Sequence, residues 1–173
     1  MNLPNLITVS RLLGLPFILY FLEDATVNHR LIALAIFLVA SATDWLDGYL
    51  ARRLDQVTEV GKFLDPLVDK LLVLAPLLSL IALGEIPPWG VFLILARELG
   101  IAGWRVMGQS SIPGANIWGK AKTVSQIGAI ALLIAPLGTD WKLTSEIAFW
   151  LAVALTLISG VIYILPSLNR EGI

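Results

Sequence analysis

The sequence predicts an all-α integral membrane protein with six transmembrane helices, and three observations lead to this prediction. The 173-residue chain is 57% hydrophobic and 14% charged, whereas soluble domains are about 45–50% apolar and about 25% charged. Its long apolar stretches are separated by short breaks rich in charged or turn-forming residues. These stretches lack the alternation of a membrane strand, and a helix satisfies its own backbone hydrogen bonds in lipid.

Six stretches, some with polar residues at one end, have the length of about 20 residues that crosses a bilayer. They are residues 4–22, 30–51, 62–83, 87–107, 117–137 and 146–166. The first stretch lacks a basic start and a small-residue cleavage site, so we expect a retained span rather than a signal peptide. The chain length fits a single membrane domain over residues 1–173.

Basic residues predict the orientation of the bundle, because cytoplasmic segments are rich in Lys and Arg. With the N-terminus in the cytoplasm, the outer side has only Arg30 and Lys142. The cytoplasmic side then has Arg52, Arg53, Arg105, Lys120 and Arg170. Both termini are therefore expected in the cytoplasm, with the bundle in a bacterial inner membrane or, as an alternative, a mitochondrial one. No patch of basic and aromatic residues indicates nucleic-acid binding.

Four aspartates form two pairs near the cytoplasmic ends of the second and third expected helices. Asp44 and Asp47 are three residues apart, and Asp65 and Asp69 are four apart. Each spacing places both carboxylates on one helix face. Because the linker between these helices is short, we expect them to pack antiparallel with the two pairs face to face.

Four adjacent carboxylates require protonation or a counter-charge, and a carboxylate within a membrane helix already costs about 2.5–3.5 kcal/mol on insertion scales. Oxygen ligands favour hard cations such as Mg²⁺, Mn²⁺ or Ca²⁺. The chain has no cysteine and only one histidine, so its composition does not fit a zinc site. Two metals bridged by aspartates suit phosphoryl transfer. The alternative is a set of helix-end aspartates paired with Arg52, Arg53, Lys62 and Lys70.

Small residues lie beside both pairs. Gly48 follows Asp47, and Gly61 precedes Asp65 at the start of the third expected helix. Glycine at these positions allows a ligand to approach the backbone closely. Packing of one membrane helix against another through small residues is an equal alternative for Gly48.

The complete run has the pattern D-x2-D-G-x2-A-R-x8-G-x3-D-x3-D. Its fixed positions are Asp44, Asp47, Gly48, Ala51, Arg52, Gly61, Asp65 and Asp69. This pattern resembles the signature of the CDP-alcohol phosphotransferases at every position. The resemblance extends over nearly the whole chain through the expected layout of six spans.

The resemblance implies a reaction in which a CDP-linked lipid donates its phosphatidyl group to an alcohol and releases CMP. It implies two divalent metal ions, Mg²⁺ or Mn²⁺, held by Asp44, Asp47, Asp65 and Asp69. It also implies that Asp69 is the general base for the attacking hydroxyl group. The residues implied for CDP binding are Gly48, Ala51, Arg52 and Gly61. A homodimer is implied as well.

Other stretches indicate the acceptor alcohol. LPNLITVSR resembles the N-terminal pattern of this family's phosphatidylglycerophosphate synthases, and ARELGIAGWRV and GKAKT resemble their later helices. The candidate acceptor residues are Asn5, Thr8, Arg11, Lys70, Arg97, Arg105, Lys120 and Lys122. Basic side chains of this kind suit a phosphorylated acceptor such as glycerol 3-phosphate. Ordinary positive-inside anchoring is the alternative for Arg105, Lys120 and Lys122.

The predicted function is transfer of the phosphatidyl group from CDP-diacylglycerol to glycerol 3-phosphate in the membrane. One alternative is a member of the same family with inositol phosphate, serine or phosphatidylglycerol as acceptor. A divalent-cation transporter is an alternative from another class, although such sites tend to lie at the midplane between inverted repeats. An intramembrane aspartyl protease fits less well, because it needs two aspartates that share a proton.

Overall fold

The computed structural model describes residues 3–54, 59–106 and 117–168, with side chains described for residues 6–44, 61, 64–104 and 117–163. The described residues are helical apart from short connections, which confirms the all-α prediction. The elements are α1 (Leu3–Glu23), α2 (Val27–Leu54), α3 (Glu59–Ala82), α4 (Pro88–Val106), α5 (Ile117–Ile134), a 3₁₀ turn η1 (Thr139–Trp141) and α6 (Lys142–Leu168). Each of the six predicted stretches coincides with one α-helix.

Three regions of the described chain are long and apolar enough to cross a membrane. They are Leu6–Glu23 in α1, Val27–Asp44 in α2 and Thr139–Tyr163 at η1 and α6. The prediction of six helices is confirmed, while the crossing of the membrane by all six stays a prediction.

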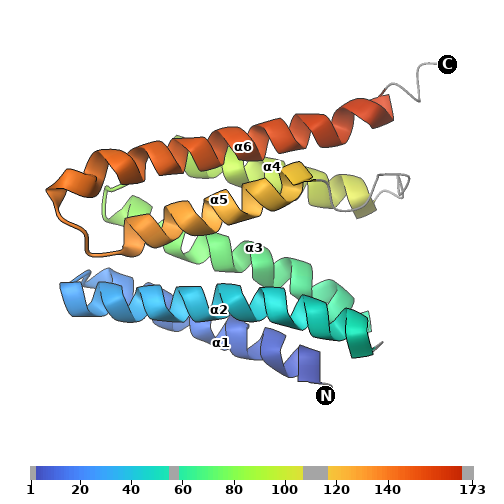
Figure 1. The fold of residues 1–173 in the computed structure, drawn as a ribbon, viewed down its shortest axis with the longest axis horizontal. Helices are drawn as coiled ribbons and strands as arrows, with labels where there is room; N and C mark the ends of the chain where they lie inside the picture. Colours follow the sequence, from blue (N-terminus) through green and yellow to red (C-terminus); the bar gives the residue numbers. More distant parts are fainter. Residues whose placement is uncertain (1–2, 55–58, 107–116, 169–173) are drawn as a thin grey trace.

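Consecutive helices run in opposite directions, and α1 begins at the end of the bundle where α6 finishes (Figure 1). Helix α1 packs along both α2 and α3, whereas α2 and α3 meet each other only over a short stretch. This differs from the expected direct packing of the second and third helices. The reason is the apolar face of α1, which buries Leu15, Ile18 and Leu22 in the bundle.

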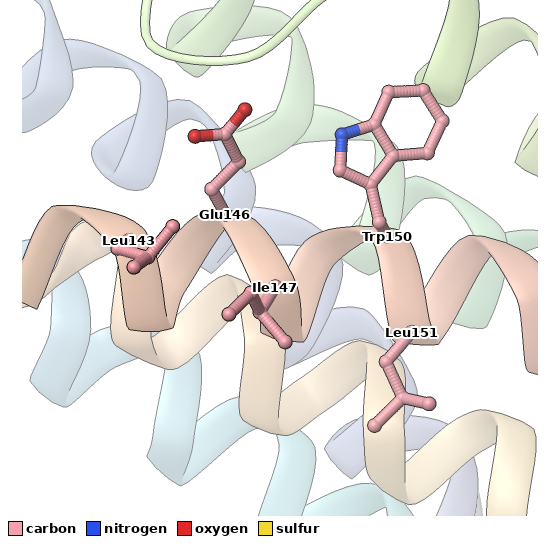
Figure 2. Close-up of a pocket in the computed structure, with 5 residues that line it drawn as sticks. All are labelled: Leu143, Glu146, Ile147, Trp150 and Leu151. Carbon is pink, nitrogen blue, oxygen red and sulfur yellow. The ribbon is translucent and has the colours of Figure 1, made fainter.

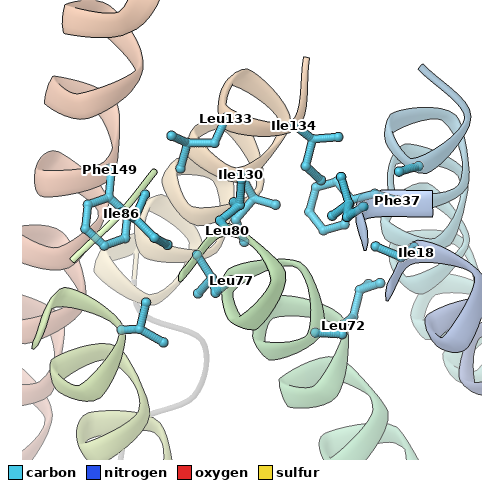
Figure 3. Close-up of a cluster of buried hydrophobic side chains, with 14 of the residues drawn as sticks. Ile18, Phe37, Leu72, Leu77, Leu80, Ile86, Ile130, Leu133, Ile134 and Phe149 are labelled. Atoms are coloured by element: carbon cyan, nitrogen blue, oxygen red, sulfur yellow. The ribbon is translucent and has the colours of Figure 1, made fainter. Parts of the chain in front are cut away.

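The hydrophobic core draws side chains from helices of both halves of the chain (Figure 3). Its labelled members are Ile18, Phe37, Leu72, Leu77, Leu80, Ile86, Ile130, Leu133, Ile134 and Phe149. Helices α5 and α6 pack along each other, and α4 packs on α6. These contacts give the bundle a fixed frame for the polar side chains nearer the end where α1 begins.

The opposite end of the bundle is closed by specific turns. Gly84 has a φ of +70° after α3, and the Glu85 N–H donates to the Leu80 carbonyl at 3.0 Å, which is a Schellman ending. Arg30 forms an ion pair with Glu85 and donates to the Leu133 carbonyl at 3.1 Å. Arg30 therefore ties α2, the α3–α4 connection and α5 together.

A surface hollow lies along the first turns of α6 (Figure 2). It is lined by Leu143, Glu146, Ile147, Trp150 and Leu151. Glu146 and Trp150 project from the same side of the helix (Figure 2). The exposed apolar side chains and the tryptophan suit contact with lipid near a membrane interface.

Candidate active site

The guanidinium of Arg11 joins carboxylates from two other helices. Arg11 lies in α1, and its side chain is only 1% exposed. Its Nη1 forms an ion pair with Asp44 of α2 and donates to Asp69 Oδ1 of α3 at 3.1 Å. One buried cation therefore supplies counter-charge to an aspartate from each predicted pair.

Thr8 lies one helical turn before Arg11 and reaches the other described aspartate. Its Oγ1 donates to Asp65 Oδ1 at 2.7 Å and accepts from Arg11 Nη2 at 3.4 Å. The i,i+3 spacing on α1 explains why both side chains face the same group of carboxylates. Helix α1 thus brings Asp44, Asp65 and Asp69 together through two of its own residues.

The sequence grouped Arg11 with the basic acceptor residues, but the structure places its guanidinium among the aspartates. The pattern of α1 predicted which residues share a face and did not specify the neighbour that this face meets. Among the side chains that the structure describes, no three carboxylates or histidines are grouped to hold a metal ion. The side chain of Asp47 lies outside the described residues, so the complete predicted set of four stays a prediction.

The carboxylates of this group remain accessible from outside. The Asp44 side chain is 36% exposed and that of Asp69 is 47% exposed, although both contact the buried Arg11. Asp44, Asp65 and Asp69 against one guanidinium give this group a formal charge of −2. An exposed, negatively charged set of oxygen ligands suits a hard cation.

The predicted CDP-binding residues are described only in part. Gly61 is buried near the start of α3, four residues before Asp65. Gly48, Ala51 and Arg52 belong to α2, but their side chains lie outside the described residues. Their assignment to the cytidine diphosphate stays a prediction.

A second charged group joins α4 and α5. Arg97 and Glu98 are neighbours in α4, and Lys122 projects from the second turn of α5. Arg97 Nη1 donates to Glu98 Oε1 at 3.1 Å, and Lys122 Nζ donates to the same oxygen at 2.5 Å. The three side chains are between 12% and 16% exposed. Two cations against one carboxylate leave a formal charge of +1.

Lys70 lies next to the negative group in α3. It follows Asp69 in α3, and its Nζ donates to the Pro66 carbonyl at 2.9 Å. It is close enough to Lys122 for the two ammonium groups to repel each other. Lys122 therefore lies within electrostatic range of two other predicted acceptor residues, Arg97 and Lys70.

The remaining predicted acceptor residues either lie elsewhere in the bundle or have side chains outside the described residues. Thr8 and Arg11 lie with the aspartates, as described above. Lys120 is exposed on the first turn of α5. Asn5 and Arg105 lie on α1 and α4, and their side chains are outside the described residues.

Comparison with known protein families identifies the family of this chain. The profile described as CDP-alcohol phosphatidyltransferase matches residues 1–158. The chain belongs to the CDP-alcohol phosphatidyltransferase family. The resemblance inferred from the aspartate signature is thereby confirmed, and this CDP-alcohol phosphatidyltransferase is a transferase enzyme.

Several relatives resemble the chain over most of its length. A Bacillus subtilis (strain 168) protein is 39% identical over 92% of this chain and 91% of its own. A Pseudomonas fluorescens protein is 39% identical over 99% and 94%. A Rickettsia bellii (strain RML369-C) protein is 35% identical over 94% and 93%. All three are named CDP-diacylglycerol–glycerol-3-phosphate 3-phosphatidyltransferase.

Proposed function

We propose that this CDP-alcohol phosphatidyltransferase transfers the phosphatidyl group of CDP-diacylglycerol to glycerol 3-phosphate. The products are phosphatidylglycerophosphate and CMP. The observation that carries the proposal is the pair of oppositely charged groups, around Arg11 and around Arg97, in the same half of the bundle. The negative group suits the cations that a diphosphate requires, and the positive group suits a phosphorylated acceptor. The names of the relatives support the same pair of substrates.

The carboxylate chemistry of the negative group suits two divalent cations, Mg²⁺ or Mn²⁺. Asp44, Asp47, Asp65 and Asp69 would hold them, because carboxylate oxygens are the ligands that these hard cations prefer. When bound, such cations neutralise the diphosphate and stabilise the departing CMP. Arg11 and Thr8 orient the carboxylates through the hydrogen bonds described above. Gly48, Ala51, Arg52 and Gly61 would contact the cytidine diphosphate.

Asp69 is the proposed general base. Its half-exposed carboxylate takes the proton from an acceptor hydroxyl group. The hydroxyl oxygen then forms a bond to the phosphatidyl phosphorus, and the bond from that phosphorus to the CMP oxygen breaks. Lys70, adjacent to Asp69, and the Arg97–Lys122 group would hold the phosphate of glycerol 3-phosphate. Asn5, Arg105 and Lys120 are the other candidates for this contact.

The proposed setting is a single domain with six membrane spans and both termini in the cytoplasm. The excess of Lys and Arg on one side supports this orientation. Both charged groups would then open toward the cytoplasm, where glycerol 3-phosphate is soluble. The proposal includes a homodimer in the bacterial inner membrane.

The test is CMP release by the purified full chain with CDP-diacylglycerol and one acceptor at a time. The acceptors are glycerol 3-phosphate, inositol phosphate, serine and phosphatidylglycerol. We expect glycerol 3-phosphate to give the highest kcat/KM. Faster turnover with serine or phosphatidylglycerol would overturn the acceptor assignment, and metal flux into liposomes without CMP release would favour cation transport.

A further inference from the structure

A network of hydrogen bonds connects α4, α5 and α6 beside the proposed acceptor site. One part of the network is the pair of bonds from Arg97 and Lys122 to Glu98 Oε1. Arg97 extends the network to α6, because its Nη2 donates to Ser159 Oγ at 3.0 Å. The Arg97 side chain is therefore fixed at its tip by two helices.

The network continues in the interior of the α5–α6 contact. Ser159 Oγ donates to the Thr156 carbonyl at 2.8 Å, and Gln126 Nε2 donates to Thr156 Oγ1 at 2.8 Å. Gln126 lies four residues after Lys122, so both project from the same face of α5. Gln126, Thr156 and Ser159 are no more than 4% exposed. Buried hydrogen bonds of this kind restrict side-chain positions, and the Arg97 Nε atom is the one atom of this network that is buried without a hydrogen-bond partner among the described residues.

Gly160 allows the stem of Arg97 to cross α6. A Cβ atom at position 160 would lie 2.9 Å from Arg97 Cγ and 3.3 Å from its Nε. Cγ belongs to the inner part of the side chain, so any larger residue would displace the whole arginine stem. Gly128 of α5 provides a contrast, since a Cβ there would meet no described atom within 4 Å.

We propose that Glu98, Ser159 and Gly160 are positioning residues that hold Arg97 and Lys122 ready to bind the phosphate group of the acceptor. This inference rests on the proposed function and assigns residues that the aspartate signature does not include. Glu98 keeps two like charges close together, while the group retains its formal charge of +1. An acceptor phosphate then meets donors that are already in place, which lowers the entropic cost of binding.

The first test is steady-state kinetics of Glu98→Gln, with each substrate varied in turn. We expect the KM for glycerol 3-phosphate to rise about tenfold, because a charged hydrogen-bond acceptor is lost. The KM for CDP-diacylglycerol should stay within about twofold of the wild-type value. Glu98→Asp, which keeps the carboxylate, should show a smaller rise. Glu85→Gln is the matched control, since it removes a carboxylate paired with Arg30 at the other end of the bundle.

Gly160→Ala tests the same inference without removing a charge. We expect a rise of about fivefold in the KM for glycerol 3-phosphate alone, with Gly128→Ala unchanged. If the Glu98 variants fail to fold, Gly160→Ala alone tests the positioning role. An equal rise in both KM values with a lower melting temperature, or unchanged KM values, would overturn the positioning role.

The two proposals fail in distinguishable ways. Wild-type enzyme that uses no phosphorylated acceptor would refute the proposed function and this inference together. Wild-type enzyme that uses glycerol 3-phosphate, with the Glu98 and Gly160 variants unaffected, would refute the positioning role alone.

Discussion

Arg11 and Arg97 both lie within the bundle and both contact carboxylates, but their surroundings carry opposite formal charges. Arg11 faces Asp44 and Asp69, with Asp65 joined through Thr8, so negative charge is in excess. Arg97 shares the single carboxylate of Glu98 with Lys122, so positive charge is in excess. The comparison indicates that an arginine inside a membrane bundle takes its role from the balance of the charges around it.

The two groups also differ in which helices they join. The carboxylates around Arg11 come from α2 and α3, so Arg11 connects elements that otherwise meet only briefly. The carboxylate of Arg97 comes from the next residue of the same helix, and its other partner is the Ser159 hydroxyl of α6. Substitutions in the first group should therefore abolish turnover. Substitutions in the second group should weaken the binding of one substrate, glycerol 3-phosphate.

Metal removal should give the largest effect, and it reports on the negative group. We expect excess chelator to reduce CMP release to background, because the diphosphate would lose its counter-charge. Addition of Mg²⁺ or Mn²⁺ in excess of the chelator should restore the rate. Full CMP release in excess chelator would rule out the proposed two-cation chemistry.

Asp69→Asn should give the next largest effect. Asparagine has nearly the same size and still accepts a hydrogen bond from Arg11, but it takes no proton from the acceptor. We expect kcat to fall by about 10²–10⁴-fold, the usual contribution of a general base. Asp140→Asn, in the exposed turn η1, is the matched control and should leave kcat unchanged. Normal turnover by Asp69→Asn would refute the assignment of the base.

Arg97→Ala should have a smaller effect, and one confined to the acceptor. A charged hydrogen bond contributes about 1.5–3 kcal/mol, so the KM for glycerol 3-phosphate should rise by about 10- to 100-fold. The KM for CDP-diacylglycerol should change little. A similar rise in both KM values would remove the distinction between the two charged groups.

Arg30→Ala should give the smallest effect, on stability alone. Arg30 is paired with Glu85 and the Leu133 carbonyl, far along the helices from both charged groups. Because both side chains of the ion pair are partly exposed, we expect a loss of about 1 kcal/mol in unfolding free energy. Thermal unfolding in detergent measures this loss. A change in either KM would contradict a purely structural role.

The sequence was sufficient to predict the helices and the proximity of Asp44 to Asp69, which both contact Arg11. Apolar length located each helix to within a few residues, and the spacing of Asp65 and Asp69 predicted a shared face. The position of α1 against both α2 and α3 was not predictable, because helical periodicity shows which residues share a face and not which neighbour covers it. For the same reason the sequence did not show that Arg11 contacts Asp44 and Asp69.

The hydrogen-bond network around Arg97 was harder still to predict, because its members are far apart in the chain. Ser159 and Gly160 are small residues in an apolar helix, a pattern that usually indicates helix packing. Their role depends on the crossing of α4 over α6, which only the folded bundle provides. The adjacent Arg97 and Glu98 were the one local signal. Their adjacency predicted an ion pair but did not indicate its function.

The link between Arg11 and Asp69 also bears on the order in which the bundle is assembled. The two residues are 58 positions apart, so α1 leaves the ribosome well before its partner in α3. An unpaired arginine in a membrane helix costs about 2.5–3.5 kcal/mol on insertion scales. Asp44 of α2 is therefore the first counter-charge that Arg11 can meet, and the arrival of α3 adds Asp69 and completes the group. Assembly of the bundle and formation of the proposed active site would then depend on the same step, the docking of α3 against α1.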